Sequence, residues 1–341
     1  MAGVEVASEA KMSDTVVKSD SLREVYGKTL VELADPDKPN FYVFSADLAG
    51  GCGEHHFRKA FPSRHLEVGI AESAMMGIAA GFQAQVGVPV FVNSFATFLL
   101  RGLEPARLAI FHDKRNVRIV CSHLGLSAGP DGSSVQELSY IATWRSIPNS
   151  IVVWPADANE LRQVLEWSLD YKGPMVIFTG RNPAVNVTPS NYQFVFGKGS
   201  LVYPLATRDD PTRDLYPRTS DVTLIACGRI VAICIEAARQ LGEMGIEARV
   251  ANLSTLKPVD AEFLLRLQQT SSGLITVEDH NTLGGLYSIV AEALAPEGSG
   301  VPIIPIAVQN TFGESGEPDQ LYRKYGIGVE AVVKRVKESI G

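Results

Sequence analysis

The chain has 341 residues, which is long enough for two domains that each bury a hydrophobic core. Its 31 lysine and arginine residues are outnumbered by 38 aspartate and glutamate residues, which argues against a nucleic-acid-binding or anionic-membrane-binding surface. The four cysteines lack metal-ligand or disulfide spacing and no apolar run approaches the roughly 20 residues that span a bilayer, so we expect a cytoplasmic protein with reduced thiols.

The first half of the chain alternates apolar runs with helical segments. Residues 1–20 are polar, acidic and small, and we expect them to form a disordered lead. Strands are expected at 41–48, 65–70, 88–95, 117–123, 150–157 and 174–180, and helices at 72–85, 98–114, 134–147 and 158–171. Continuous apolar strands are covered on both faces and need crossover helices. Residues 21–190 are therefore predicted to be an α/β domain with a mainly parallel sheet.

Residues 191–219 interrupt this alternation with charges and prolines, and we expect a linker or insert there. The alternation resumes in a smaller region over 220–341. Strands are expected at 221–228, 247–254, 273–279 and 302–309, and helices at 229–245, 260–269, 285–295 and 329–341. The predicted fold is therefore α/β with two domains, each a mainly parallel sheet flanked by helices.

Polar residues follow four of the predicted strands of the first domain. They are Asp47, Glu72, His123 and Arg181. Each has an ordinary explanation, and for Glu72 it is a favourable interaction with the positive end of the helix dipole. In parallel α/β sheets, however, ligands bind beyond the carboxyl ends of the strands. Because the four positions converge on one edge, the sequence predicts a site there.

Six sequence blocks carry a resemblance to a known family. They are "FSADL", "FPSRHLEVGIAESAMMGIAAG", "FVNSFATFLLR", "GLSAGPDGSS", "RSIPNSIVVWPADANE" and "EDHNTLGG". In this order the blocks resemble the transketolase family, in particular the carboxy-terminal subunit of a split transketolase. The resemblance implies a thiamine diphosphate pyrimidine-binding domain over 21–190 and a transketolase C-terminal domain over 220–341. It also implies transfer of a two-carbon ketol unit from a ketose, expected to be phosphorylated, to an aldose.

The same resemblance places four residues in the cofactor pocket. Glu72 matches the glutamate that hydrogen-bonds the aminopyrimidine ring and promotes its tautomerisation, so it is a predicted catalytic residue. Phe98 is expected to stack on the aminopyrimidine and Phe95 to line the pocket, although an arbitrary phenylalanine is more simply a core residue. Asp47 is similar to a residue on the thiazolium side, with a turn role as the alternative.

Four residues are matched to the substrate. Arg181, in "TGRNP", matches a phosphate-binding arginine, a role that suits the paired donors of a guanidinium. Arg101 resembles an arginine of deoxyxylulose phosphate synthases and many split transketolases. His123, also predicted to be catalytic, and Asp131 match a pair that contacts the hydroxyls and carbonyl of the sugar. A solvated Arg101 and a hydrogen-bonded structural His123 are the alternatives.

Three positions depart from the family pattern. Val135 stands where a histidine normally contacts the ketose donor, and it can neither donate a hydrogen bond nor move a proton. Gly51 stands where many transketolases have a phosphate-contacting serine, and Tyr287 replaces a glycine. These departures weaken the case for the usual pentose phosphates and leave a non-standard substrate open.

The family's diphosphate-binding and metal-binding motif, with its Gly-Asp-Gly start and later asparagine, is missing from this chain. We therefore expect no metal ligands here, because a separate N-terminal subunit would supply Mg²⁺, its ligands and the diphosphate site. The expected assembly is an α₂β₂ heterotetramer with active sites between subunits. Three alternatives stay open at this point: a beta subunit of a 2-oxo-acid dehydrogenase-type enzyme, a deoxyxylulose phosphate synthase-like enzyme, and a non-enzymatic interaction subunit.

Overall fold

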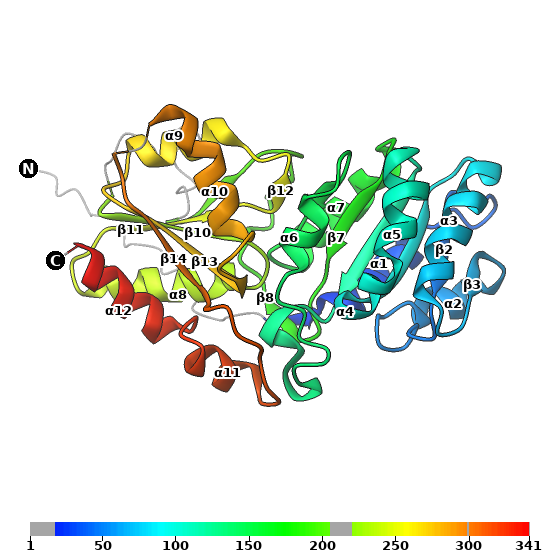
Figure 1. The fold of residues 1–341 in the computed structure, drawn as a ribbon, viewed down its shortest axis with the longest axis horizontal. Helices are drawn as coiled ribbons and strands as arrows, with labels where there is room; N and C mark the ends of the chain where they lie inside the picture. Colours follow the sequence, from blue (N-terminus) through cyan, green and yellow to red (C-terminus); the bar gives the residue numbers. More distant parts are fainter. Residues whose placement is uncertain (1–17, 205–219, 299, 341) are drawn as a thin grey trace, which may run out of the picture.

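The computed structural model describes residues 18–204, 220–298 and 300–340, which form two α/β lobes lying side by side (Figure 1). Residues 1–17, most of the expected lead, and residues 205–219, half of the expected linker, lie outside the described residues. Within the described ranges, no helix is long and apolar enough to cross a membrane.

The first lobe is built on a seven-stranded sheet with the order β12-β6-β7-β5-β4-β2-β3. The strands are β2 (Tyr42–Ser45), β3 (His65–Glu67), β4 (Val90–Phe95), β5 (Val117–Ser122), β6 (Ile151–Val153), β7 (Met175–Phe178) and β12 (Thr255–Lys257). Every pairing is parallel except that of β12 with β6. The neighbouring strands β7, β5, β4, β2 and β3 therefore end at the same edge.

Helices cover both faces of this sheet. They are α1 (Leu22–Leu33) and α7 (Ala158–Asp170) on one face, and α3 (Glu72–Val86), η3 (Ala106–His112) and α6 (Tyr140–Arg145) on the other. Successive strand residues point to opposite faces, so Val43 packs with the first group and Phe44 with the second. Both faces being buried explains the continuous apolar runs and confirms the predicted parallel sheet.

Two predicted helices differ from the observed ones. The helix expected over 134–147 begins only at Tyr140, because Gln136 Nε2 donates to Gly129 O at 3.0 Å and to Glu314 O at 2.9 Å and so holds the preceding chain in turns. The helix expected over 98–114 is divided into α4 (Ala96–Leu99), η2 (Leu100–Gly102), α5 (Leu103–Pro105) and η3. Pro105, which has no amide hydrogen, lies at one of these junctions.

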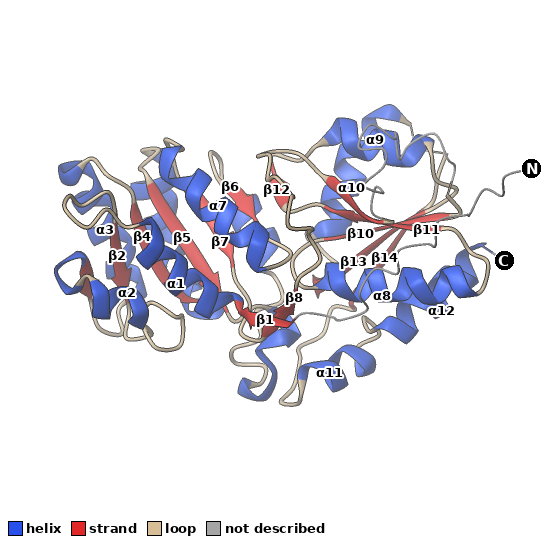
Figure 2. Cartoon of the chain, turned by 180° about the vertical axis from the view of Figure 1, so that it is seen from behind, coloured by secondary structure: helices blue, strands red, loops and turns tan. Residues whose placement is uncertain are grey.

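The second lobe contains a five-stranded sheet with the order β14-β13-β10-β11-β9 (Figure 2). The strands are β9 (Ser200–Tyr203), β10 (Val222–Ala226), β11 (Ala248–Asn252), β13 (Leu274–Asn281) and β14 (Ile303–Val308). On one face lie α8 (Ile230–Glu243) and α12 (Val329–Ile340), and on the other lie α9 (Ala261–Gln269) and α10 (Leu286–Leu294). All pairings are parallel except that of β9 with β11.

Three short strands depart from the predicted division of the chain. β9 lies within the expected linker but forms an edge of the second sheet. β1 (Lys18–Ser21) begins within the expected lead and pairs antiparallel with β8 (Pro183–Val185). β12 follows the second lobe's β11 in sequence yet joins the first sheet, so the two domains are interleaved at their contact.

The two lobes share a continuous hydrophobic core. Trp154, just after β6, packs in one cluster with Cys227 and Leu253 of the second lobe. Its backbone amide donates to Ser254 O at 2.7 Å. A Cβ on Gly228, whose φ is +57°, would lie 2.1 Å from the Trp154 ring, so only glycine permits this approach.

Candidate functional site

The structure brings the sequence-predicted residues to one edge of the first sheet. Asp47 follows β2, Glu72 begins α3 after β3, Phe95 ends β4, His123 follows β5 and Arg181 follows β7. These are the carboxyl ends of neighbouring parallel strands, which is where ligands of such sheets bind. The placement agrees with the predicted site, whereas the role of each residue stays a prediction.

Glu72 is a buried carboxyl group at the first position of α3, with only 3% of the residue exposed. The next inward-facing residues of the helix, Met75 and Met76, are completely buried. Gly102 allows η2 to approach α3 closely, because a Cβ on Gly102 would lie 2.8 Å from Met76 Cγ and 3.0 Å from Glu72 O. The first turn of α3 is therefore packed closely against η2 and buried.

Arg101 lies near this carboxyl group. Its Nη1 atom lies 3.7 Å from Glu72 Oε1, longer than a normal hydrogen bond, and its side chain is 63% exposed. The guanidinium carbon also lies 5.2 Å from the ring centroid of Phe98. Arg101 thus contacts two residues matched to the cofactor.

An aromatic wall, formed by Phe95, Phe98 and His123, lies next to Arg101. Phe95 and Phe98 are half-buried and stack with 5.4 Å between ring centroids and 19° between ring planes. Phe95 also stacks on the imidazole of His123, with 3.7 Å between centroids. The three rings are thus stacked on one another, with Phe95 between Phe98 and His123. Aromatic side chains of this kind can pack against a heteroaromatic ligand.

His123 is 2% exposed and adopts a left-handed backbone conformation, with φ +55°, directly after β5. This conformation is uncommon for a residue with a side chain and occurs often at functional sites. Its Nδ1 atom lies 2.9 Å from Ser122 Oγ. Burial, followed by the charges of Arg23 and Arg181, lowers the pKa of His123 to about 3, so its imidazole is neutral at pH 7.

Arg181 and Asp131 lie together at the outer part of the edge. Arg181 Nε is 3.7 Å from Asp131 Oδ2, and Arg181 Nη1 donates to Ala128 O at 2.9 Å. Arg181 also lines an open cavity of about 520 Å³ together with Arg23 and Asn182. Glu317 lines the cavity as well, so two guanidinium groups and one carboxylate surround a space that is large enough for an anion.

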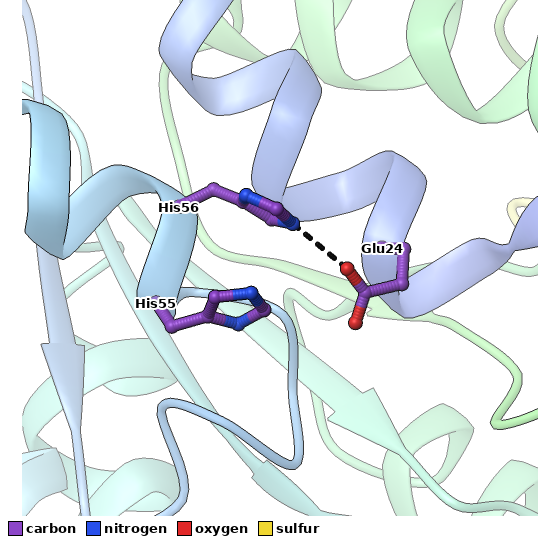
Figure 3. A group of neighbouring side chains, drawn as sticks. All are labelled: Glu24, His55 and His56. Carbon is purple, nitrogen blue, oxygen red and sulfur yellow. Dashed lines mark hydrogen bonds and ion pairs between the residues drawn. The ribbon is translucent and has the colours of Figure 1, made fainter.

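Arg23 was not predicted from the sequence. It lies at the start of α1, a helix missing from the predicted elements, and its Nη1 donates to Gly51 O at 2.9 Å. The amphipathic pattern of residues 22–33 was the signal for this helix. A helix there would have placed Arg23, in its first turn, near the strand ends. Its neighbour Glu24 accepts a hydrogen bond from His56 Nε2 at 2.8 Å, which ties α1 to α2 (His55–Ala60) (Figure 3).

Asp47 has features of a turn residue. Its φ is +59°, it is exposed, and its backbone amide donates to Glu67 Oε1 at 2.7 Å. The same carboxylate oxygen accepts from Gly69 N at 3.0 Å. The turn alternative therefore has direct structural support, and a cofactor contact for Asp47 stays a prediction.

The three departures from the family pattern have distinct surroundings. Val135 is 9% exposed. The amide of Tyr287 donates to Glu278 Oε1 at 3.0 Å. A Cβ on Gly51 would lie 3.1 Å from Phe95 Cε1, so a serine at this position would press on the aromatic wall.

Comparisons with known proteins agree with this arrangement. Residues 18–184 match the family model for the transketolase pyrimidine binding domain, and residues 215–332 match that for the transketolase C-terminal domain. A transketolase C-terminal section from Methanocaldococcus jannaschii is 34% identical over 322 residues, which cover 94% of this chain and 96% of that protein. These matches confirm the family and the two-domain fold predicted from the six blocks.

A further relative is named as a transketolase subunit, and a solved structure is described as a split transketolase. The 6-deoxy-6-sulfo-D-fructose transketolase subunit SqwH of Clostridium sp. (strain MSTE9) is 33% identical over 318 residues, or 93% of this chain and 94% of that one. A solved structure described as a split gene transketolase, inactive beta4 tetramer, has a TM-score of 0.81 and 35% identity, and the match covers 94% of this chain and 99% of that chain. This chain therefore belongs to the transketolase family and covers nearly the full length of the split sections that it matches.

Proposed function

We propose that this chain is the C-terminal subunit of a split thiamine diphosphate-dependent transketolase, which transfers a two-carbon ketol unit from an anionic ketose to an aldose. The observation that carries the proposal is that Arg101 lies near both the buried Glu72 carboxyl group and Phe98, which stacks on Phe95. Split transketolase subunits among the relatives favour this function over a 2-oxo-acid dehydrogenase-type or deoxyxylulose phosphate synthase-like enzyme.

The residues at the inner part of the edge fit an aminopyrimidine ring. A buried carboxyl group is costly unless a partner hydrogen-bonds it, and Arg101 is too distant for a normal hydrogen bond. When bound, thiamine diphosphate supplies the carbon nucleophile of the reaction. Glu72 would hold a proton at the pyrimidine ring nitrogen, and Phe95 and Phe98 would exclude water from the ring face.

The residues at the outer part of the edge fit an anionic sugar. Arg23 and Arg181 line the same cavity, and two guanidinium groups can bind a terminal phosphate or sulfonate through paired hydrogen bonds. Asp131 and His123 would contact the hydroxyl and carbonyl groups between this anion and the cofactor. The neutral imidazole of His123 can donate one hydrogen bond and accept another.

The residue at position 135 is consistent with a ketose other than the usual pentose phosphates. Buried Val135 offers no hydrogen bond where the family has histidine. The SqwH relative is named for a ketose that carries a sulfonate. These observations support a substrate with a terminal anion and fewer hydrogen bonds to the loop at residue 135.

The site is proposed to be completed by an N-terminal, diphosphate-binding subunit in an α₂β₂ heterotetramer. The described residues place carboxylate, aromatic and guanidinium groups at the edge. They offer one cluster with metal-ligand spacing, Glu24 with His55 and His56, which lacks the aspartate and asparagine of the family's Mg²⁺ site. Mg²⁺ and its ligands are accordingly assigned to the partner subunit, where they would neutralise the diphosphate.

Ketol transfer by the chain assembled with its partner subunit tests the proposal. With thiamine diphosphate, Mg²⁺ and ketoses carrying phosphate or sulfonate, the wild-type complex is expected to form the transferred ketose. Glu72→Gln should lower kcat by about 100-fold or more, as expected for loss of a proton-transferring group. The matched control, Glu104→Gln, changes an exposed carboxylate on α5 and should have no effect. Full turnover by Glu72→Gln would overturn the assignment.

A further inference from the structure

The segment 125–136, here called the substrate loop, belongs to the first lobe and makes hydrogen bonds to the second lobe. It begins two residues after His123 and carries Asp131. Gly125, Gly129 and Gly132 all have positive φ, which glycine adopts readily. Because glycines leave the backbone many conformations, the path of the loop depends on contacts with other segments. Residues 125–129, 132, 135 and 136 of the loop are buried, whereas Pro130, Asp131, Ser133 and Ser134 are exposed.

Asp279 of β13 makes the most direct of these contacts. It is completely buried, and its carboxylate accepts from Leu126 N at 2.7 Å and from Ser127 N at 3.1 Å. A third bond comes from Tyr322 of α11 (Pro318–Lys324), whose hydroxyl donates at 2.8 Å. A Cβ on Gly125 would lie 2.4 Å from Asp279 Oδ1, so the glycine is what allows the loop to reach the carboxylate.

The same loop segment holds the anion-binding arginine from its other side. Ser127 O accepts from Asn182 Nδ2 at 2.7 Å, and Ala128 O accepts from Arg181 Nη1 at 2.9 Å. Asp279 therefore grips the amide of Ser127, while the carbonyls of Ser127 and Ala128 orient the segment that carries Arg181. An unbroken path of hydrogen bonds runs from β13 to the cavity.

These hydrogen bonds are expected to affect substrate binding more than the chemical step. Asp279 lies on the second lobe and reaches Arg181 through the loop. Glu72, Phe95 and Phe98 lie instead on α3, β4 and α4. A displaced loop would misplace the guanidinium that grips the substrate's terminal anion. Glu72, Phe95 and Phe98 lie outside the loop and would be displaced less.

We propose that Asp279 is a positioning residue by which the C-terminal domain fixes the substrate loop, and through it Arg181, for binding of the substrate's terminal anion. The inference rests on the proposed function and gives the C-terminal domain a specific part in it. Asp279→Asn is the sharpest change, because the amide keeps the shape of the side chain but presents a donor where a backbone N–H also donates.

The test compares two donors in the assembled holoenzyme: a ketose phosphate and a short ketose without a terminal anion. Asp279→Asn is expected to raise KM for the phosphorylated donor on the order of tenfold, with kcat within about threefold, because a positioning group is displaced. KM for the uncharged donor should rise less, because that donor loses only the contact to Asp131 on the same loop and makes none to Arg181. Tyr322→Phe, which keeps the carboxylate and removes one donor, should give a smaller shift in the same direction. Asp319→Asn, an exposed aspartate on α11, is the matched control.

Hydrogen exchange in the same complex provides a readout that does not need activity. Asp279→Asn should speed exchange of the Leu126 and Ser127 amides, and Asp319→Asn should not. An unchanged KM together with faster exchange would overturn the inference by showing a structural role only. An equal rise in KM for both donors would overturn it as well, because Arg181 would then not be the target. If the wild-type complex transferred no ketol unit, the proposed function would fail. The exchange rates would still show whether Asp279 holds the Leu126 and Ser127 amides.

Discussion

At the scale of single residues, His123 shows how surroundings decide the state of a group. It is buried next to Phe95, and Arg23 and Arg181 add positive charge, so its pKa falls from 6.5 to about 3. Between these pH values the unfolded chain binds a proton on this imidazole that the folded chain does not bind. The free energy of unfolding therefore falls as the pH is lowered from 6.5 towards 3.

His123→Asn is expected to reduce this acid destabilisation. The asparagine does not titrate, so the thermal unfolding midpoint should fall less between pH 6.5 and pH 4 than it does in the wild type. Burial also lowers the pKa of His280 to about 4. Part of the acid destabilisation should therefore remain in His123→Asn. His112→Asn changes an exposed histidine and serves as the control. Parallel pH profiles for His123→Asn and wild type would contradict the burial account.

At the scale of elements, the loop after β2 shapes the cofactor pocket through a glycine. Gly51 faces the ring of Phe95, and a Cβ there would lie 3.1 Å from Cε1 and 3.2 Å from Cζ. Phe95 cannot retreat freely because it stacks on both Phe98 and His123. The loop and β4 are therefore packed to a fixed spacing.

Gly51→Ala should weaken binding of thiamine diphosphate to the assembled enzyme by about tenfold, since overpacking costs on the order of 1–3 kcal/mol. Gly50→Ala is a close control, because a Cβ on Gly50 meets nothing within 4 Å. Cofactor titrations followed by activity would measure both variants. Equal affinities for the two variants would show that the aromatic wall tolerates the extra methyl group.

Local pattern predicted most elements of this fold but not all of them. The apolar strands and the helix that begins at Glu72 could be recognised because both faces of the sheet are buried. The late start of α6 could not, because a side-chain contact from Gln136 to Glu314, far along the chain, holds the preceding turns. Strands β9 and β12 are short edge strands whose pairing depends on partners in other parts of the sequence.

At the scale of the whole molecule, some site residues could likewise be predicted from local sequence, whereas others depend on contacts between distant segments. Residues at strand ends, such as Glu72 and Arg181, could be predicted because parallel topology gathers those ends at one edge. Arg23 and Asp279 reach the site from a helix and from the other lobe, so only the folded chain shows their contacts. The second lobe is thus joined to the first by a shared core and by polar contacts to the substrate loop.

The central claim is that this chain provides the pyrimidine half of a cofactor site and another subunit provides the diphosphate half. Calorimetric titration of thiamine diphosphate with Mg²⁺ into the isolated chain, the isolated partner and their mixture tests it most directly. The account predicts tight, saturable binding in the mixture alone, with a stoichiometry of one cofactor per pair of chains. Equally tight binding by the isolated chain would contradict it.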